Sequence, residues 1–438
     1  MASSQFFKAL AAIFGGFVLT TFSPMPANAR VAPAPPLFKF SFGTAPAAPG
    51  TIAITPQSLY SPTTGYGLEA GADLNQRDKP FLFSVALPEG NYQVTLRFGD
   101  AQTDSRTTVK AESRRLMIQD VKTAPGEFAA RSFAVNIRTD ALKSGQKVRL
   151  KAREAGVLHW DDKLTLEING AKPRLQTLEI ASAPNIPTLY IAGDSTVTDQ
   201  PNEPWAGWGQ MLPRFFDAGI AVANYAESGE TLRAFVGEKR LEKILDSLKT
   251  GDYLFIQFGH NDMKERDEGI GAFTSYSDSL RAMIAAAKNA GATPVLLTPM
   301  ERRRFDANGK SEATLGDYPA AVRRVAREEK VPLIDLNALS TRFYQALGPE
   351  GSKKAFVHFA ANTFPGQSVA LRDDTHFNPY GAFQLARGVV EAIKTVAPEL
   401  AKHLQSDVSA FDPSQPDAPE TWDVPASPSL EMTKPDGN

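Results

Sequence analysis

The first half of the chain carries short runs in which apolar and polar residues alternate, separated by turn-forming residues. The run at 80–87 ends at Pro88-Glu89-Gly90-Asn91, and a second alternating run follows at 92–98. Alternation turns one face of a strand toward a core and the other toward water, so this pattern predicts a strand, a turn and a strand. Similar runs lie at 131–137, 147–150 and 163–168, and no long helical period interrupts them. We therefore predict an all-β sandwich over residues 37–183.

After residue 186 the pattern changes to short, fully apolar runs that alternate with helical stretches. The apolar runs lie at 188–192, 221–225, 253–257, 294–297 and 331–334. Between them, apolar residues recur three and four positions apart, as at Leu241, Ile244, Leu245 and Leu248. Apolar strands separated by amphipathic helices are typical of a parallel sheet with helices on both faces. We predict a three-layer α/β domain over residues 186–404, closed by a last helix from Pro379 to about Leu404.

Both ends of the chain differ in composition from the two halves. An apolar stretch at 9–22 lies between Lys8 and the small-residue site Ala27-Asn28-Ala29, which is typical of a signal peptide at 1–29 cleaved after Ala29. An uncleaved anchor is the alternative, but the stretch is too short to span a bilayer as a helix. We therefore expect an exported protein, secreted or periplasmic, without a membrane span in its mature form.

Two low-complexity segments flank the predicted domains. Residues 30–36 form a Pro/Ala linker, and residues 405–438 are polar, acidic and Pro-rich, for which we predict disorder. The chain of 438 residues has a formal net charge of −2 and no cysteine. Without a basic excess there is no electrostatic footprint for nucleic acid or an anionic membrane surface. Without cysteine an exported protein has no disulfides, so burial must supply its stability.

Four polar motifs stand at the ends of the predicted strands or beside the last helix. Gly-Asp-Ser-Thr at 193–196 follows the first apolar run, and Asn-Tyr-Ala-Glu-Ser-Gly at 224–229 ends the second. Gly-His-Asn-Asp at 259–262 follows the third, and Asp-Asp-Thr-His at 373–376 precedes the last helix. Ligands of open α/β sheets bind outside the carboxyl ends of the strands, so we expect these motifs to converge there.

Their residue types supply what nucleophilic acyl transfer needs. Ser195 is the candidate nucleophile, and His376 is the base that takes its proton. Asp373 lies three residues before His376, so one turn can carry both side chains to the same point and orient the imidazole. Asp374 is the rival carboxylate, because adjacency leaves the register open. Candidate oxyanion donors are the main-chain N–H groups of Ser195 and Gly229 and the side-chain amide of Asn261.

These motifs, in this order, resemble the GDSL/SGNH hydrolase family over residues 186–404. The resemblance implies an SGNH (flavodoxin-like) fold, with Ser195, Gly229, Asn261, Asp373 and His376 at the matching family positions. The fuller strings at 192–197, 258–262 and 375–378 look most like the rhamnogalacturonan acetylesterases. That branch implies removal of acetyl groups from pectic polysaccharide without a metal or cofactor. The β-sandwich before it would then be an accessory domain of the galactose-binding-like type.

Other polar residues have weaker functional interpretations. His260 is expected to shape the loop that presents Asn261 and is also a candidate substrate-binding residue. No His-Glu-x-x-His pattern suggests a metal site. The segment Glu301-Arg302-Arg303-Arg304 is either a solvated loop or, through Arg303 or Arg304, a binder of a uronic-acid carboxylate. His159-Trp160-Asp161-Asp162 is either an exposed turn or a site for sugar or calcium, and we expect the turn.

The sequence leaves two functional alternatives beside an esterase acting on acetylated rhamnogalacturonan. One is the same chemistry on another ester, such as acetylated xylan or a lysophospholipid. The other is a glycan-binding protein without catalysis, built on a hydrolase scaffold. In each case the expected partner is an acetylated polysaccharide or a related ester, and no cofactor is expected.

Overall fold

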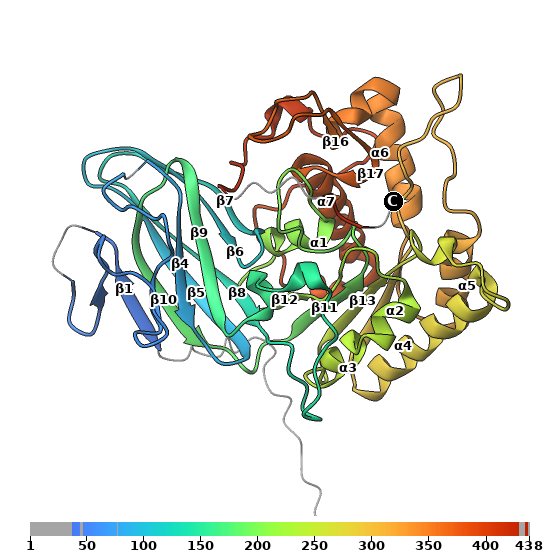
Figure 1. Cartoon of the computed structure of the whole chain (residues 1–438), viewed down its shortest axis with the longest axis horizontal. Helices are drawn as coiled ribbons and strands as arrows, with labels where there is room; N and C mark the ends of the chain where they lie inside the picture. The colour runs from blue at the N-terminus through green and yellow to red at the C-terminus, as the bar shows by residue number, and fades with distance from the viewer. Residues whose placement is uncertain (1–36, 44–46, 77, 429–433, 437–438) are drawn as a thin grey trace, which may run out of the picture. The chain divides into compact units, whose positions relative to one another are not determined.

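The computed structural model describes residues 37–43, 47–76, 78–428 and 434–436 (Figure 1). The predicted signal peptide at 1–29 and linker at 30–36 lie outside these residues. Over this part of the chain, no helix is both long and apolar enough to cross a membrane.

The first region consists of two facing sheets of mainly antiparallel strands. One sheet has the order β3 (Tyr66–Leu68), β4 (Phe81–Ala86), β9 (Lys163–Lys172), β6 (Ser105–Ala111) and β7 (Arg115–Thr123). Facing it are β8 (Phe128–Ile137), β5 (Gly90–Gly99), β10 (Leu175–Ser182), β1 (Phe38–Ser41) and β2 (Ile52–Ala53). Buried side chains from both sheets form one core, among them Phe40, Phe83, Val94, Leu166 and Leu178. The predicted β-sandwich is confirmed.

The second region is the predicted α/β fold. Its parallel strands are β12 (Ala221–Asn224), β11 (Thr188–Gly193), β13 (Tyr253–Gln257), β14 (Thr293–Leu297) and β15 (Leu333–Ile334). Alternate residues of β11 enter different cores: Leu189 and Ile191 lie in one, and Tyr190 and Ala192 in the other. A strand buried on both faces needs no polar face, which explains why these runs are uniformly apolar.

Helices complete both cores of this sheet (Figure 1). The first core includes residues of α1 (Trp208–Met211), α6 (Leu336–Gly351), α7 (Pro379–Val396) and α8 (Pro398–Ala401). The second includes residues of α2 (Leu232–Gly237), α3 (Arg240–Leu245), α4 (Ser277–Asn289) and α5 (Tyr318–Glu329). The last helix, expected to continue to about Leu404, ends at Val396 because Pro398 cannot continue its hydrogen bonding.

The two regions share one sheet. β12 pairs in parallel with β8 at Val222 and Val135, so ten strands run in the order β15-β14-β13-β11-β12-β8-β5-β10-β1-β2. Buried ion pairs also join the regions: Arg115 Nε lies 2.5 Å from Asp199 Oδ2, and an Arg114 nitrogen lies 2.6 Å from Glu203 Oε1. The sandwich and the α/β region belong to the same compact unit.

The predicted disorder of the C-terminal segment is wrong for residues 405–428. Phe411 is buried, and the Trp422 ring lies 5.1 Å from that of Phe383 in α7. Tyr380 of α7 donates its hydroxyl hydrogen to the Asp417 carbonyl at 2.6 Å. The composition suggested disorder because apolar residues are sparse in this segment. The few that it has, Phe411 and Trp422 among them, are spaced so that they pack against α7.

Candidate active site

The parallel strands bring three of the four motifs to one edge of the sheet. β11 lies between β12 and β13, with Ile191 opposite Asn224 and Gly193 opposite Gln257. The loops that follow these strands are therefore neighbours at the carboxyl edge. The Glu227 N–H donates to the Gly193 carbonyl at 3.1 Å, which ties the second loop to the first.

The fourth motif completes a hydrogen-bonded chain of three side chains. His376 Nε2 lies 2.8 Å from Ser195 Oγ, and His376 Nδ1 lies 2.8 Å from Asp373 Oδ2. Ser195 and His376 are each 1% exposed. This is the order hydroxyl, imidazole and carboxylate that makes a serine nucleophilic.

A bulge in a strand, rather than a simple turn, brings Asp373 and His376 together. Both belong to β17 (Leu371–Phe377), which pairs with β16 (Phe356–Phe359). Phe356 pairs with Phe377 whereas Val357 pairs with Asp373, so residues 374–376 are extra residues on one strand. Residues three apart on a regular strand point to opposite faces, and the bulge removes this constraint.

Local hydrogen bonds fix the carboxylate in this bulge. Asp373 Oδ1 accepts from the N–H groups of Thr375 at 2.9 Å and His376 at 3.0 Å. Burial by itself raises the pKa of Asp373. The hydrogen bonds from His376 and from the Thr375 N–H, together with the charge of His376, lower it by more, so that the pKa lies well below its ordinary value. Asp373 is therefore a carboxylate at neutral pH.

Asp374, the rival carboxylate, points elsewhere. Arg303 Nη1 donates to Asp374 Oδ1 at 2.6 Å, and His358 Nε2 lies 2.8 Å from the same oxygen. The Asp374 side chain is 50% exposed, whereas that of Asp373 is 4% exposed. Of the two adjacent carboxylates, Asp373 alone bonds to the imidazole of His376 among the described contacts.

The candidate oxyanion donors have hydrogens available for a ligand. Within the described residues, neither the Ser195 N–H nor the Gly229 N–H donates to a protein acceptor. Asn261 uses one amide hydrogen on the Glu230 carbonyl at 3.0 Å, which leaves the second. The backbone of Gly229 has φ +76°, a left-handed conformation that favours glycine.

His260 supports the nucleophile loop. Its Nδ1 lies 3.2 Å from Asp194 Oδ2, while Asp194 Oδ1 accepts from the Thr196 hydroxyl at 2.7 Å. Burial raises the pKa of Asp194, but the nearby His260 and the Thr196 hydrogen bonds lower it overall. The expected role of His260 in shaping the Asn261 loop remains a prediction; its observed contacts link that loop to the residue before Ser195.

The two candidate uronate-binding arginines are engaged by protein groups. Arg303 donates to Ser352 Oγ at 3.1 Å and to the Pro349 carbonyl at 2.6 Å, in addition to Asp374. Arg304 pairs with Glu312 at 2.6 Å. Arg303 therefore braces the bulged strand, and none of the contacts among the described residues directs either arginine toward Ser195. The segment is not simply solvated, because Glu301 is buried.

The expectation of an exposed turn at 159–162 is wrong for its first two residues. His159 and Trp160 are 4% and 8% exposed. His159 Nδ1 lies 2.7 Å from Ser113 Oγ, and Trp160 Nε1 donates to Glu154 at 3.1 Å. Their burial depends on contacts with distant segments, which a local pattern of polar residues does not reveal.

The sequence interpretation missed several cations beside the candidate site. Lys151 Nζ donates to the Ser228 carbonyl at 2.7 Å, and Arg153 donates to the same oxygen. Lys434 Nζ lies 3.8 Å from Asp373 Oδ2. The basic segment Lys151-Ala152-Arg153, directly after the predicted strand at 147–150, was the signal available, but nothing local connects it to residue 228.

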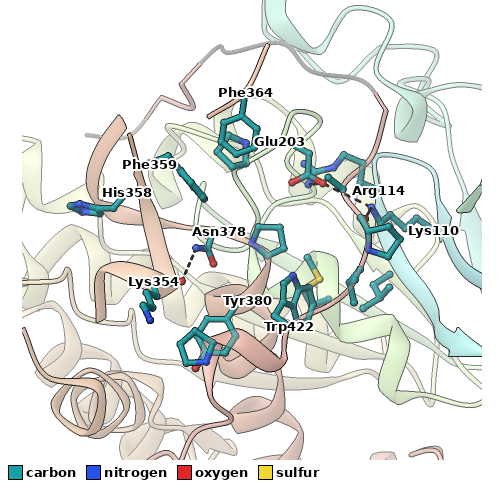
Figure 2. Close-up of a pocket in the computed structure, with 18 of the residues that line it drawn as sticks. Lys110, Arg114, Glu203, Lys354, His358, Phe359, Phe364, Asn378, Tyr380 and Trp422 are labelled. Atoms are coloured by element: carbon teal, nitrogen blue, oxygen red, sulfur yellow. Dashed lines mark hydrogen bonds and ion pairs between the residues drawn. The ribbon is translucent and has the colours of Figure 1, made fainter. Parts of the chain in front are cut away.

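A cavity of about 390 Å³ lies beside β16, the partner of the bulged strand (Figure 2). Its wall is rich in aromatic rings and prolines and includes Phe359, Phe364, Tyr380 and Trp422. Figure 2 shows Glu203 and Arg114 on the side opposite His358. Because Trp422 and residues 424–426 form part of this wall, the C-terminal segment completes the cavity.

Among the described residues, no cluster of three or more histidine and carboxylate side chains is arranged to hold a metal ion.

The fold and the relay of Ser195, His376 and Asp373 define the class: a serine hydrolase built on a parallel α/β sheet.

Residues 191–382 match the GDSL-like Lipase/Acylhydrolase family. Rhamnogalacturonan acetylesterase RhgT of Bacillus subtilis (strain 168) is 43% identical over 220 residues, which are 50% of this chain and 94% of that protein. Probable rhamnogalacturonan acetylesterase YesY of the same organism is 36% identical over 221 residues, 49% of this chain and 96% of that protein. Uncharacterized esterase YxiM, also from that organism, is 28% identical over 415 residues, 88% of this chain and 98% of that protein.

The chain belongs to the GDSL/SGNH hydrolase family, and it is an esterase. This confirms the resemblance drawn from the four motifs.

Proposed function

We propose that this esterase removes O-acetyl groups from a plant cell-wall polysaccharide, with rhamnogalacturonan as the preferred substrate. The observation that carries the chemistry is the relay of Ser195 Oγ, His376 Nε2 and Asp373, with 2.8 Å at each step. The substrate assignment is supported by two relatives whose names include rhamnogalacturonan acetylesterase, which are 43% identical over 220 residues and 36% identical over 221 residues of this chain.

The proposed reaction has two acyl-transfer steps. Ser195 Oγ attacks the acetyl carbonyl carbon while His376 Nε2 takes the hydroxyl proton. The resulting oxyanion receives hydrogen bonds from the N–H groups of Ser195 and Gly229 and from the Asn261 amide. As the intermediate collapses, His376 gives its proton to the departing sugar oxygen. A water molecule, deprotonated by His376, then attacks the acetyl-serine, and His376 returns this proton to Ser195 Oγ as the ester bond breaks and acetate leaves.

Asp373 acts throughout as the partner of the imidazole. Its carboxylate accepts the Nδ1 hydrogen of His376, which leaves Nε2 as the acceptor facing Ser195. The negative charge also stabilises the imidazolium that forms during each step.

The test is acetate release from acetylated rhamnogalacturonan and from acetylated xylan, with the Ser195→Ala variant as control. We expect faster release from rhamnogalacturonan, and loss of release from both polymers in the variant. Faster release from xylan would refute the substrate assignment and leave the chemistry intact. Equal activity of Ser195→Ala and the parent would refute the catalytic assignment. Failure of a serine-directed organophosphonate to label folded protein would favour the non-catalytic glycan binder.

We also propose that the protein is exported, as a substrate outside the cell requires. The apolar stretch at 9–22 and the site after Ala29 support this. N-terminal sequencing of protein recovered outside the cytoplasm should begin at Arg30, and recovery of the full-length chain in the cytoplasm alone would contradict export.

A further inference from the structure

Two cations from the β-sandwich region contact one peptide group beside the nucleophile. Lys151 Nζ donates to the Ser228 carbonyl oxygen at 2.7 Å, and Arg153 Nη2 donates to the same oxygen. A β-carbon placed on Gly229 would lie 3.6 Å from Lys151 Nζ and 3.8 Å from Arg153 Nη2. Both side chains therefore pack against the Ser228–Gly229 peptide.

That carbonyl belongs to the same peptide group as the Gly229 N–H. The only cis peptide bond among the described residues is Glu203–Pro204, so the Ser228–Gly229 peptide is trans. In a trans peptide the C=O and N–H point in opposite directions. With the carbonyl facing the two cations, the N–H faces away from them, and it has no protein acceptor in the described part of the chain.

Two charge-assisted hydrogen bonds to a carbonyl have two effects. They fix the rotation of the peptide plane, because both donors must keep their geometry. They also withdraw electron density from the amide, so the N–H on the other side becomes a stronger donor. An oxyanion hole benefits from both effects, since its donors must be aligned before charge develops.

The segment that supplies these cations is firmly anchored. Glu154 accepts from the Lys151 N–H at 2.8 Å, from Trp160 Nε1 at 3.1 Å and from Arg240 Nη1 at 3.0 Å. Trp160 also packs edge-on against Tyr225, in the loop that leads to Ser228, with ring centroids 5.6 Å apart. The cations are therefore presented by a buried framework that also contacts the loop they hold.

We propose that Lys151 and Arg153 are positioning residues of the oxyanion hole, which hold and polarise the Ser228–Gly229 peptide so that its N–H meets the developing oxyanion. This inference rests on the proposed function, because it assumes that Gly229 is an oxyanion donor. It gives the β-sandwich region a role in catalysis that acts through the Ser228–Gly229 peptide and goes beyond packing or carbohydrate binding.

Ion pairing with nearby acids is the competing structural explanation. Arg153 Nε lies 2.9 Å from Glu227 Oε1, and Lys151 pairs with Glu230. If pairing were the whole role, loss of the cations would lower stability but leave the turnover of each folded molecule unchanged. A catalytic measurement per active site separates the two explanations.

The experiment compares Lys151→Met, Arg153→Met and the double variant with Arg149→Met. Arg149 lies in the same segment and also donates to a backbone carbonyl, that of Gly237, away from Ser228. Hydrolysis of p-nitrophenyl acetate is measured, with active sites counted by organophosphonate titration. Loss of a whole oxyanion donor costs about 10²–10³ in turnover, so we expect kcat of the double variant to fall roughly 10- to 100-fold.

Two further readouts distinguish positioning from stability. KM should change by less than about twofold, while binding of a boronic acid, whose serine adduct carries a tetrahedral oxyanion, should weaken by the same factor as kcat. Arg153→Lys, which keeps a cation near the carbonyl, should recover part of the loss. Arg149→Met should retain the parent kcat.

The outcomes separate this inference from the proposed function. If the double variant keeps the parent kcat per titrated site, or if kcat and boronate affinity do not fall together, positioning is refuted. If Ser195→Ala hydrolyses p-nitrophenyl acetate as the parent does, the proposed function itself fails. A variant too unstable to purify is replaced by the single variants, which are judged by the same two criteria.

Discussion

At the scale of single residues, the bulge at 374–376 decides which carboxylate serves His376. The chain offers two adjacent acids, and a regular strand would place residue 374 on the same face as residue 376. In the bulge, Asp373 instead accepts hydrogen bonds from the His376 ring and from two main-chain N–H groups. Asp374 is left to pair with Arg303 and His358.

This arrangement predicts different effects for two matched substitutions. Asp373→Asn should lower kcat by about 10²–10⁴, because the amide no longer stabilises the imidazolium and can favour the wrong tautomer. Asp374→Asn should change kcat by less than about threefold, since Asp374 is half exposed and does not contact the imidazole. Steady-state hydrolysis of p-nitrophenyl acetate measures both. The reverse ranking would show that Asp374 is the functional carboxylate.

At the scale of elements, the C-terminal segment is held by a few well-spaced contacts. Phe411 is 7% exposed and lies under the guanidinium of Arg387, with 4.7 Å between Cζ and the ring centroid. Asp417 pairs with the same arginine at 2.5 Å. These contacts line one side of α7, whose other residues belong to the core of the sheet.

Phe411→Ala therefore tests whether this segment contributes to stability. Removing a buried phenylalanine should lower the free energy of unfolding by about 3–5 kcal/mol. The control is Phe273→Ala, because Phe273 is 42% exposed and should cost less than about 1 kcal/mol. Urea unfolding followed by tryptophan fluorescence provides the comparison. Equal, small effects of the two substitutions would mean that the segment does not pack as described.

At the scale of the whole molecule, the shared sheet makes the two regions one folding unit. RhgT of Bacillus subtilis matches 220 residues of this chain, and these make up 94% of RhgT. The few remaining residues of RhgT are too few for a comparable sandwich, so a family member does not need one. Here β12 pairs with β8, and the buried ion pair of Arg115 and Asp199 crosses between the regions. In this chain, the strand that pairs with the outer edge of β12 in the α/β sheet is therefore β8 of the sandwich.

We expect thermal unfolding to show a single calorimetric transition, which Arg115→Met shifts as a whole. Removal of one partner of a buried ion pair costs about 3–5 kcal/mol, because the remaining charge is left without compensation. Lys172→Met is the control, since Lys172 also pairs with an aspartate, Asp104, but is 46% exposed, and both partners lie in the sandwich. Two separated transitions, of which Arg115→Met moves only one, would contradict a single unit.

The sequence by itself determined the features that depend on local order. Alternating and fully apolar runs distinguished the sandwich from the parallel sheet, because the period of burial along a strand is set by which faces are covered. The strand-end positions of Ser195 and Asn261 followed from the same patterns, because parallel strands expose their carboxyl ends at one edge. The choice between Asp373 and Asp374 did not follow from these patterns, because the bulge that decides it depends on how β17 pairs with β16.

Only the tertiary structure decided which distant segments meet. The pairing of β12 with β8, the packing of residues 405–428 on α7 and the contact of Lys151 and Arg153 with Ser228 all join segments more than 20 residues apart. Such contacts arise from the joint fit of whole surfaces, and hydrophobic periodicity within one segment carries no information about its partner. Local motifs thus identified the residues of the esterase chemistry, whereas long-range packing decided which other residues hold the active site in place.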